Sequence, residues 1–195
     1  RSLDWDEKQF LIPPLNPVPV DDLRGIEWNI QKIRAPEVWS QGYRGQGIVV
    51  GVLDSGVNYN HNDLKDHMWT APGYPHHGYD FVNNDNNPMD DEGHGTHCAG
   101  IVAGDGTSGN KTGVAPDAKI MALKVLDSQG NGQESDAWAA LQFAIENGAH
   151  IASLSIGWIH AQNPDRSTWR TTCNSALAAG LVMAGVRLFQ MLGAH

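Results

Sequence analysis

The sequence predicts an α/β fold in three layers, with a mainly parallel sheet between two layers of helices. Short apolar runs rich in β-branched residues recur along the chain, as at 48–53 and 119–126, and stretches with the apolar spacing of helices separate them. This alternation favours right-handed βαβ crossovers, which build parallel sheets covered on both faces. The 195 residues are enough for one domain with a sizeable core, and no internal repeat is visible.

The chain divides into an arm, a domain and a tail. Residues 1–24 hold four prolines between positions 13 and 19, and proline lacks a backbone N–H and fixes φ, so an extended arm is expected. The globular pattern covers 25–183, and the tail is 184–195. Since the first residue is Arg1 and no charged-then-apolar leader follows, we expect a processed or excised piece of a longer protein.

Each element of the domain has its own signal. Strands are short apolar runs, helices carry apolar residues at helical spacing, and turns are rich in Asn, Asp, Gly and Pro. Ser135 is the expected N-cap of one helix and Gly148 its stop. The expected elements, in order, are a helix at 32–40, strands at 48–53 and 78–82, a helix from about 94 to 104, a strand at 119–126, a helix at 133–147, a strand at 150–156, a helix near 167–179 and a strand at 181–186.

Composition excludes several classes of protein. With 13 Lys and Arg against 22 Asp and Glu, the net charge is −9, which argues against a nucleic-acid binder. Hydrophobic residues make up 41% and there are seven Trp, so the chain is not disordered. No apolar run reaches the length of a membrane span, and the mean hydropathy is −0.38. The two cysteines, Cys98 and Cys173, allow one disulfide or none.

Two residues lie at positions that suit a catalytic role. Asp54 ends the first predicted strand, and ligand sites of open α/β sheets gather at the carboxyl ends of strands. His94 opens a predicted helix, whose dipole disfavours the imidazolium and so favours a neutral ring that can accept a proton. Each has an ordinary alternative, since Asp54 also suits a turn cap and His94 a cap or a core position.

A metal site is the other possibility for the histidines. His94 and His97 are three positions apart and share one helix face. The zinc-protease helix instead has its histidines four apart with a Glu after the first, and a catalytic zinc needs a third ligand. A metal-dependent hydrolase is therefore the weakest of the alternatives.

The ordered set of motifs is more specific than any single one. In chain order these motifs are VLDSG at 52–56, HNDL at 61–64, GHGTHCAG at 93–100, GVAP at 113–116 and KVL at 124–126. With these motifs, the chain from about residue 28 to 182 resembles the subtilisin-like serine proteases. The resemblance implies their three-layer fold, incomplete at its C-terminal end. It also implies that Asp54 is the triad aspartate and His94 the general base, and that His97 and Cys98 have structural roles. Cys98 then lies behind the base, where a mercurial would impair the site.

The resemblance also implies contacts to substrate and to calcium. Two segments are similar to those that hold an extended peptide by strand addition, and Asp63 and Asp105 match the region of a calcium site. A second oxygen-rich stretch, between 80 and 91, is another place for a hard cation, and both stretches also suit ordinary solvated turns. No organic cofactor is expected. The substrate-binding residues are Gly130, Asn131, Gly132, Ser155, Ile156 and Gly157.

The resemblance ends near Met183. The family's nucleophilic Ser lies in a Gly-Thr-Ser-Met-Ala type motif far downstream of the His, and its oxyanion Asn follows a strand. Neither is found in these 195 residues, since Ser108 lies in a loop just after the His helix. A truncation, a frame change or an altered sequence explains the tail. We expect the chain alone to be inactive as a peptidase and to expose apolar faces and a strand edge, giving low stability or self-association.

Two functions therefore remain from the residues and the resemblance. The first is a secreted endopeptidase that cleaves protein or peptide substrates by Asp-His-Ser acyl transfer, accompanied by an inhibitory prodomain. The second is a non-catalytic relative that uses the same groove to bind extended peptides or a prodomain.

Overall fold

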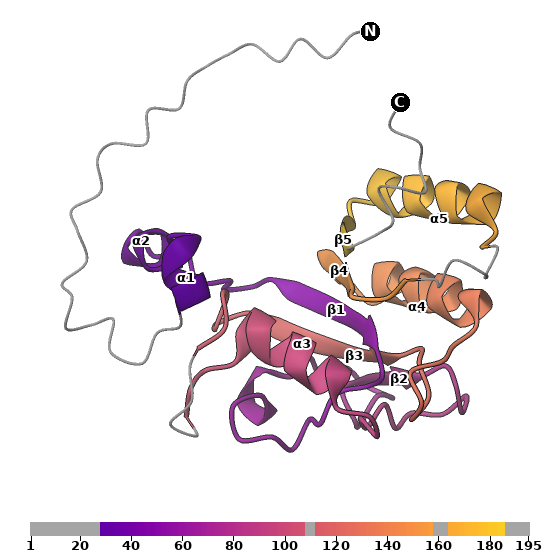
Figure 1. Ribbon diagram of the computed structural model, residues 1–195, viewed down its shortest axis with the longest axis horizontal. Coiled ribbons are helices and arrows are strands. Elements are labelled where there is room, and N and C mark those ends of the chain that lie inside the picture. The colour runs from indigo at the N-terminus through magenta and orange to yellow at the C-terminus, as the bar shows by residue number, and fades with distance from the viewer. Residues whose placement is uncertain (1–27, 108–111, 158–163, 186–195) are drawn as a thin grey trace, which may run out of the picture.

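The computed structural model describes residues 28–107, 112–157 and 164–185 (Figure 1). The arm predicted at 1–24 lies outside the described residues, as does most of the tail predicted at 184–195. None of the described helices combines the length and the apolar character needed to cross a bilayer.

A parallel five-stranded sheet forms the centre of the domain. The strands are β1 (Val49–Asp54), β2 (Gly78–Asp80), β3 (Lys119–Lys124), β4 (Ile151–Leu154) and β5 (Val182–Gly185). Their order across the sheet is β2-β3-β1-β4-β5, and each neighbouring pair runs parallel. All five predicted strands are present, and most are shorter than predicted.

Helices cover both faces of the sheet. Figure 1 shows α3 on one side of β1 and α4 with α5 on the other. The expected single helix at 32–40 is wrong, because Arg34 adopts a left-handed φ of 61° and divides the segment into two short helices. The helices are α1 (Trp28–Lys32), α2 (Ala35–Ser40), the 3₁₀ turn η2 (Lys65–His67), α3 (His94–Ala103), α4 (Glu134–Glu146) and α5 (Arg166–Ala178).

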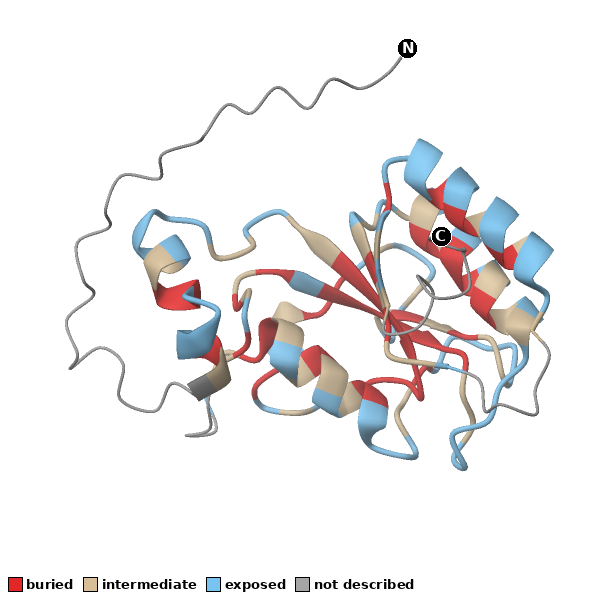
Figure 2. Cartoon of the chain, turned by 45° about the horizontal axis from the view of Figure 1, so that its top comes forward, coloured by how far each residue is buried: buried red, intermediate tan, exposed pale blue. Residues whose placement is uncertain are grey.

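The core is divided by the sheet into two clusters. Successive side chains of a strand point to opposite faces, so Leu53 of β1 packs with α4 and α5, whereas Val52 packs with α3. Trp169 of α5 is fully buried in the first cluster, and Ala99 of α3 in the second. Figure 2 shows buried residues along the central strands and on the helix faces that meet the sheet. The three-layer prediction is confirmed.

Helix α4 starts one residue earlier than its predicted cap. The N-cap is Gln133, which makes no side-chain capping bond, so the prediction that Ser135 caps this helix is wrong. At the other end Gly148 follows the C-cap Asn147 with a φ of 75°, which is the expected glycine stop. Helix α5 begins at Arg166, and the carboxylate of its N-cap Asp165 accepts the backbone N–H groups of Ser167 and Thr168.

The first turn of α3 lies directly against the end of β1. A Cβ atom added at Gly95 would fall 2.1 Å from the carbonyl oxygen of Gly56 and 3.0 Å from the Asp54 Cβ. Only glycine permits this approach, which explains why a helix rich in poor helix formers is used here. The close packing brings the first residue of α3 to the carboxyl end of β1.

Candidate active site

Asp54 ends β1 in the interior of the molecule. Its side chain is only 1% exposed. The backbone carbonyl accepts hydrogen bonds from Val125 (2.8 Å) and Leu126 (3.2 Å), which fixes the strand end against the segment after β3. The carboxylate oxygen Oδ1 accepts the backbone N–H of Ser55 at 2.8 Å. The acidic group is therefore held rigidly at the edge of the sheet where the carboxyl ends of the strands meet.

His94 meets this carboxylate. Its Nδ1 lies 2.7 Å from Asp54 Oδ1, which confirms the predicted contact between the strand end and the helix start. The hydrogen bond to Asp54 and the negative charges of Asp54, Glu92 and Asp90 together raise the pKa of His94, while partial burial opposes them. In the neutral ring Nδ1–H donates to Asp54, which leaves Nε2 as the proton acceptor. The His94 side chain is 47% exposed, so a substrate can reach it.

A second carboxylate ties the helix to the strand. Asp90 Oδ1 accepts the Ser55 hydroxyl (2.8 Å) and the backbone N–H of Gly93 (2.9 Å), and Oδ2 accepts the backbone N–H of Thr96 (2.9 Å). Ser55 Oγ in turn accepts the backbone N–H of Gly95 at 2.9 Å. Burial acts to raise the pKa of Asp90, but the bonds from Thr96, Gly93 and Glu92 outweigh it and lower that pKa. Asp90 thus caps α3 and fixes its position.

A buried lysine completes the support of the strand ends. Lys124, the last residue of β3, is 1% exposed. Its ammonium group donates to the carbonyl oxygens of Ser55 (2.7 Å) and Leu126 (2.8 Å) and pairs with Asp91 Oδ1 at 2.6 Å. All three partners are oxygens, so the buried charge is compensated. The sequence pattern did not predict this role of Lys124, and its available signal was the place of Lys124 in the KVL motif at 124–126.

Cys98 lies one turn along α3 from His94. Its Sγ is 3.8 Å from His94 Nδ1, and both cysteines are free thiols. Burial raises the pKa of the Cys98 thiol, with further increases from Asp54 and Asp90. The side chain is half-buried rather than fully buried, so it borders the site more closely than the prediction of a buried structural thiol implied.

The geometry argues against a metal at this cluster. Among the described residues, the group of three metal-ligating side chains is Asp54, His94 and Cys98. Two ligands on one tetrahedral zinc stand about 3.3 Å or more apart, given bonds of about 2.0–2.2 Å. The Asp54–His94 separation of 2.7 Å is therefore a direct hydrogen bond. His97 is exposed and is not part of this group, so the predicted alternative that paired it with His94 has no support.

The two predicted substrate segments line a common cavity beside His94. This cavity has a volume of about 270 Å³, and Ser55, Glu92, Leu126 and His94 complete its walls. Gly132 is required where its segment turns, because an added Cβ would fall 2.1 Å from the Val125 carbonyl oxygen. Asn131 and Gly132 belong to a second cavity that adjoins the first. The residues contributed by the two segments to the first cavity are Gly130, Ser155, Ile156 and Gly157.

The predicted calcium ligands are neighbours but do not form an oxygen cage. The backbone N–H of Asp105 donates to the Asp63 carbonyl oxygen at 3.2 Å. Asp105 Oδ2 lies 3.1 Å from His67 Nε2, and Oδ1 accepts the backbone N–H of Thr107 at 2.8 Å. Both carboxylate oxygens of Asp105 therefore have protein partners among the described residues. Part of the loop, at 108–111, lies outside the described residues, so calcium binding by Asp63 and Asp105 stays a prediction.

The second oxygen-rich stretch is also used by protein partners. Asp80 accepts the backbone N–H (2.9 Å) and the side-chain amide (2.8 Å) of Asn83, and Asp85 accepts the backbone N–H of Asn87 at 2.8 Å. Asp90 and Asp91 serve α3 and Lys124, as described above. These carboxylates organise turns and the start of α3, which is the ordinary alternative stated for the stretch.

Comparisons with known proteins agree with this geometry. A sequence model of the subtilase family matches residues 45–189. The chain is 40% identical over 159 residues to the minor extracellular protease Vpr of Bacillus subtilis, covering 77% of this chain and 18% of that protein. It is 40% identical over 134 residues to thermitase of Thermoactinomyces vulgaris, covering 67% and 44%.

Solved structures give the same answer. A cold-adapted subtilisin-like serine proteinase superposes with a TM-score of 0.61 at 28% identity, covering 73% of this chain and 47% of that one. The chain therefore spans less than half the length of these relatives. The fold, the order of the motifs and the match over most of the domain agree, and the chain belongs to the subtilase family.

Proposed function

We propose that the protein to which this chain belongs is a serine endopeptidase that hydrolyses peptide bonds by acyl transfer. The observation that carries the proposal is the 2.7 Å contact between Asp54 and His94, in a chain of the subtilase family. Asp54 holds the imidazole in the tautomer and orientation that a general base needs, and it stabilises the imidazolium that forms when His94 takes a proton.

His94 would act on a serine hydroxyl at its Nε2 atom. A hydroxyl is a weak nucleophile until a neighbouring base removes its proton. His94 would then return the proton to the leaving amine, and a second cycle with water would release the acid product. Because the chain spans less than half of its relatives, we place this serine and the oxyanion Asn in sequence outside these 195 residues, and we expect the chain alone to have no peptidase activity.

The substrate would be an extended segment of protein. Segments 130–132 and 155–157 would hold its backbone as two outer strands hold a central one, an arrangement that gives affinity without a demand for one sequence. The cavity that these segments share with His94 supports this placement.

Secretion, a prodomain and calcium belong to the same proposal. One relative is named as an extracellular protease, which supports secretion. An inhibitory prodomain would occupy the peptide groove. A calcium ion would use Asp63 and Asp105, and a fall in thermal stability on addition of EDTA, reversed by calcium and absent in Asp63→Asn, tests that site.

A second function is favoured by one observation. The 195 residues contain no Gly-Thr-Ser-Met-Ala type motif. A non-catalytic relative that binds extended peptides or a prodomain would not need one.

The complete coding sequence separates the two functions. For the peptidase we expect a downstream Asn and Gly-Thr-Ser motif, and activity that a serine reagent abolishes and a zinc chelator does not. His94→Ala should lower kcat/KM by about 10⁴-fold or more, as loss of a triad member does in serine proteases, whereas the control His97→Ala should stay near wild type. A complete protein without the serine motif, or a His94→Ala variant with full activity, would exclude the peptidase.

A further inference from the structure

Three charged residues lie in register at the carboxyl ends of neighbouring strands. Lys124 of β3 is the strand partner of Asp54 in β1 and of Asp80 in β2. None of the three is more than 2% exposed. Since adjacent strands are about 4.8 Å apart and paired residues point to the same face of a sheet, a buried cation stands between two buried carboxylates. One of these is the acid that contacts His94.

The ammonium group of Lys124 joins three segments that are separate in sequence. Its hydrogen-bond acceptors are the carbonyl oxygens of Ser55 and Leu126 and the carboxylate of Asp91. Ser55 directly follows the acid at the end of β1, Leu126 leads into the first substrate segment, and Asp91 lies three residues before His94. A lysine ammonium has three donors, so each donor has one of these oxygens as its partner.

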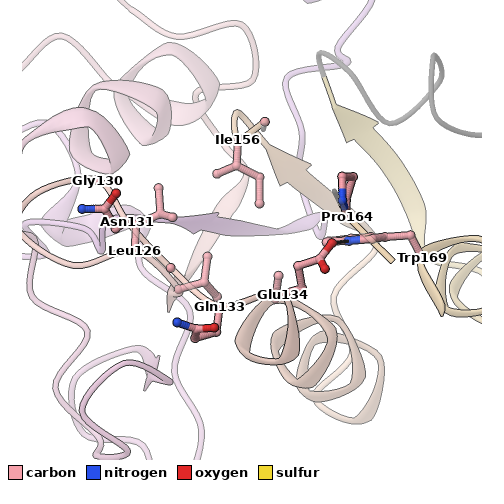
Figure 3. Close-up of a pocket in the computed structure, with 12 residues that line it drawn as sticks. Leu126, Gly130, Asn131, Gln133, Glu134, Ile156, Pro164 and Trp169 are labelled. Atoms are coloured by element: carbon pink, nitrogen blue, oxygen red, sulfur yellow. Dashed lines mark hydrogen bonds between the residues drawn. The ribbon is translucent and has the colours of Figure 1, made fainter. Parts of the chain in front are cut away.

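Leu126 makes the wall of the peptide groove part of this arrangement. It lines both the cavity beside His94 and the adjoining cavity, where Figure 3 shows it next to Asn131. Its backbone N–H donates to the Asp54 carbonyl oxygen at 3.2 Å, while its own carbonyl oxygen accepts from Lys124 at 2.8 Å. A displacement of this wall would therefore also displace the end of β1.

Stability alone does not explain a lysine at this position. Burial of an ammonium group is costly, and apolar residues of similar volume often replace a buried ion pair with no loss of stability. The Asp91 side chain is 48% exposed, so solvent screens part of its attraction to Lys124. What the ammonium supplies is geometry, because three donors on one atom fix the distances between three oxygens from different segments.

We infer that Lys124 is a positioning residue, which fixes the groove wall at Leu126, the acid at the end of β1 and the loop before His94 in one arrangement. Lys124 acts through the three oxygens that it binds, and the result is that the imidazole stays oriented towards Asp54. The inference rests on the proposed function, because it takes His94 as the base. It adds a connection between the peptide groove and the orientation of that base.

The tautomer of neutral His94 measures its orientation in the 195-residue chain without any need for catalysis. The contact with Asp54 keeps the proton on Nδ1, whereas an imidazole without that contact favours Nε2–H. Long-range ¹H–¹⁵N NMR spectra, recorded above the pKa of His94, distinguish the two forms. Lys124→Met removes all three donors and should lower the ratio of Nδ1–H to Nε2–H by about fivefold or more, the scale of one lost hydrogen bond.

Lys119→Met is the matched control at the other end of β3. Lys119 is exposed and donates to the Asp66 carbonyl oxygen at 2.7 Å, so its loss should leave the tautomer ratio unchanged. The groove side is measured by hydrogen exchange of the Leu126 amide, which should be about tenfold faster in Lys124→Met and unchanged in Lys119→Met. Circular dichroism and urea denaturation verify the fold and the global stability of each variant.

Asp91→Asn is a second and milder variant, because its side chain is half-exposed. It removes the charge from one of the three partners of Lys124 and should lower the tautomer ratio by about twofold or more. Asp85→Asn, an exposed residue of the same loop region, should leave the ratio unchanged. If Lys124→Met does not fold, the comparison of Asp91→Asn with Asp85→Asn decides the question.

The outcomes separate the inference from the proposed function. A wild-type tautomer ratio in folded Lys124→Met, even with lowered global stability, overturns the inference and leaves Lys124 a purely structural residue. An equal change in Lys119→Met also overturns it. If Nε2–H is already the main form in the wild type, the contact between Asp54 and His94 on which the proposed function rests is overturned, and the inference with it.

Discussion

The Asp90 carboxylate accepts the Ser55 hydroxyl at 2.8 Å, and this bond joins the turn after β1 to the loop before α3. Ser55 lies next to Asp54, and Asp90 caps the helix that begins with His94. The positions of the acid and of the base are therefore coupled through a second pair of side chains that touches neither substrate nor reacting atoms. Asp90 is a positioning residue, and its loss should affect both stability and the geometry of His94.

Asp90→Asn should lower the free energy of unfolding by about 2 kcal/mol, the scale of lost hydrogen bonds to a charged group. The pKa of Asp90 is depressed below its ordinary value of 3.8, so the stability that Asp90 contributes is present above about pH 4 and lost as the pH falls through the folded-state pKa. The destabilisation should therefore shrink in acid. Urea denaturation at pH 7 and pH 3 measures it. The exposed Asp85→Asn is the control, and equal effects of the two variants would contradict the assignment.

Gly95→Ala should destabilise the chain by about 1–3 kcal/mol or more and should displace α3 from β1. The added Cβ would meet the Gly56 carbonyl oxygen at 2.1 Å, which is backbone and cannot move away easily. Gly100→Ala in the same helix is the matched control, because nothing lies within 4 Å of its Cβ. It should stabilise by up to about 1 kcal/mol through helix propensity. Thermal unfolding compares the two, and a stable Gly95→Ala would refute the close-packing explanation.

Asp54→Asn should lower the pKa of His94. The hydrogen bond to Asp54 is the largest of the causes that raise the pKa of His94 above its ordinary value of 6.5. In the wild type, the stability contributed by protonated His94 is fully present below about pH 6.5 and is lost as the pH rises through the raised folded-state pKa. An NMR titration of the His94 Cε1 proton measures the pKa directly. The exposed Asp66→Asn should leave it unchanged, and an undiminished pKa in Asp54→Asn would exclude the contact as its cause.

A mercurial should modify Cys98 before Cys173, because Cys98 is half-buried and Cys173 is only 3% exposed. Mercury on Sγ, 3.8 Å from His94 Nδ1, should change the NMR titration of His94. Cys98→Ala should abolish that change and Cys173→Ala should preserve it. In the complete enzyme, labelling of Cys98 with no loss of peptidase activity would contradict the prediction.

The contact of Asp54 with His94 was predictable because the ordered motifs resemble those of the subtilisin-like proteases, whereas each residue alone also suited an ordinary cap. One carboxylate ends an apolar strand and one imidazole opens a helix of small residues, and the topology of a parallel sheet brings such ends together. The Glu134–Trp169 and Lys124–Asp91 contacts were not predicted. Each joins residues more than 30 positions apart, and the KVL motif that contains Lys124 does not indicate the partner of its side chain. Only packing of α5 on α4, or of the loop before α3 on β3, creates them.

Errors in the predicted elements have local physical causes. Ser135 is a good capping residue, but α4 already begins at Glu134, and its N-cap Gln133 lies in extended conformation. The prediction of one helix at 32–40 did not include the left-handed conformation of Arg34. Positive φ is uncommon for residues other than glycine, so the sequence carries no signal for a break there. The oxygen-rich stretch suggested a cation from composition alone, whereas the partners of its carboxylates include backbone N–H groups, the Asn83 amide, the Ser55 hydroxyl and Lys124.

The position of β1 has a consequence for how the chain reaches this structure. It is the first strand in sequence, yet it lies in the middle of the sheet, between β3 and β4. Val50 pairs with Ile120 on one side and with Ile151 on the other. Both pairings therefore form only at the cost of the conformational entropy of the long segments that separate the strands in sequence. During synthesis one edge of β1 stays unpaired until β3, which ends at residue 124, has left the ribosome, and the other edge until β4, which ends at residue 154, has left it. Folding should therefore be slow and dominated by distant contacts, and a nascent chain stopped before β4 should be a substrate for chaperones.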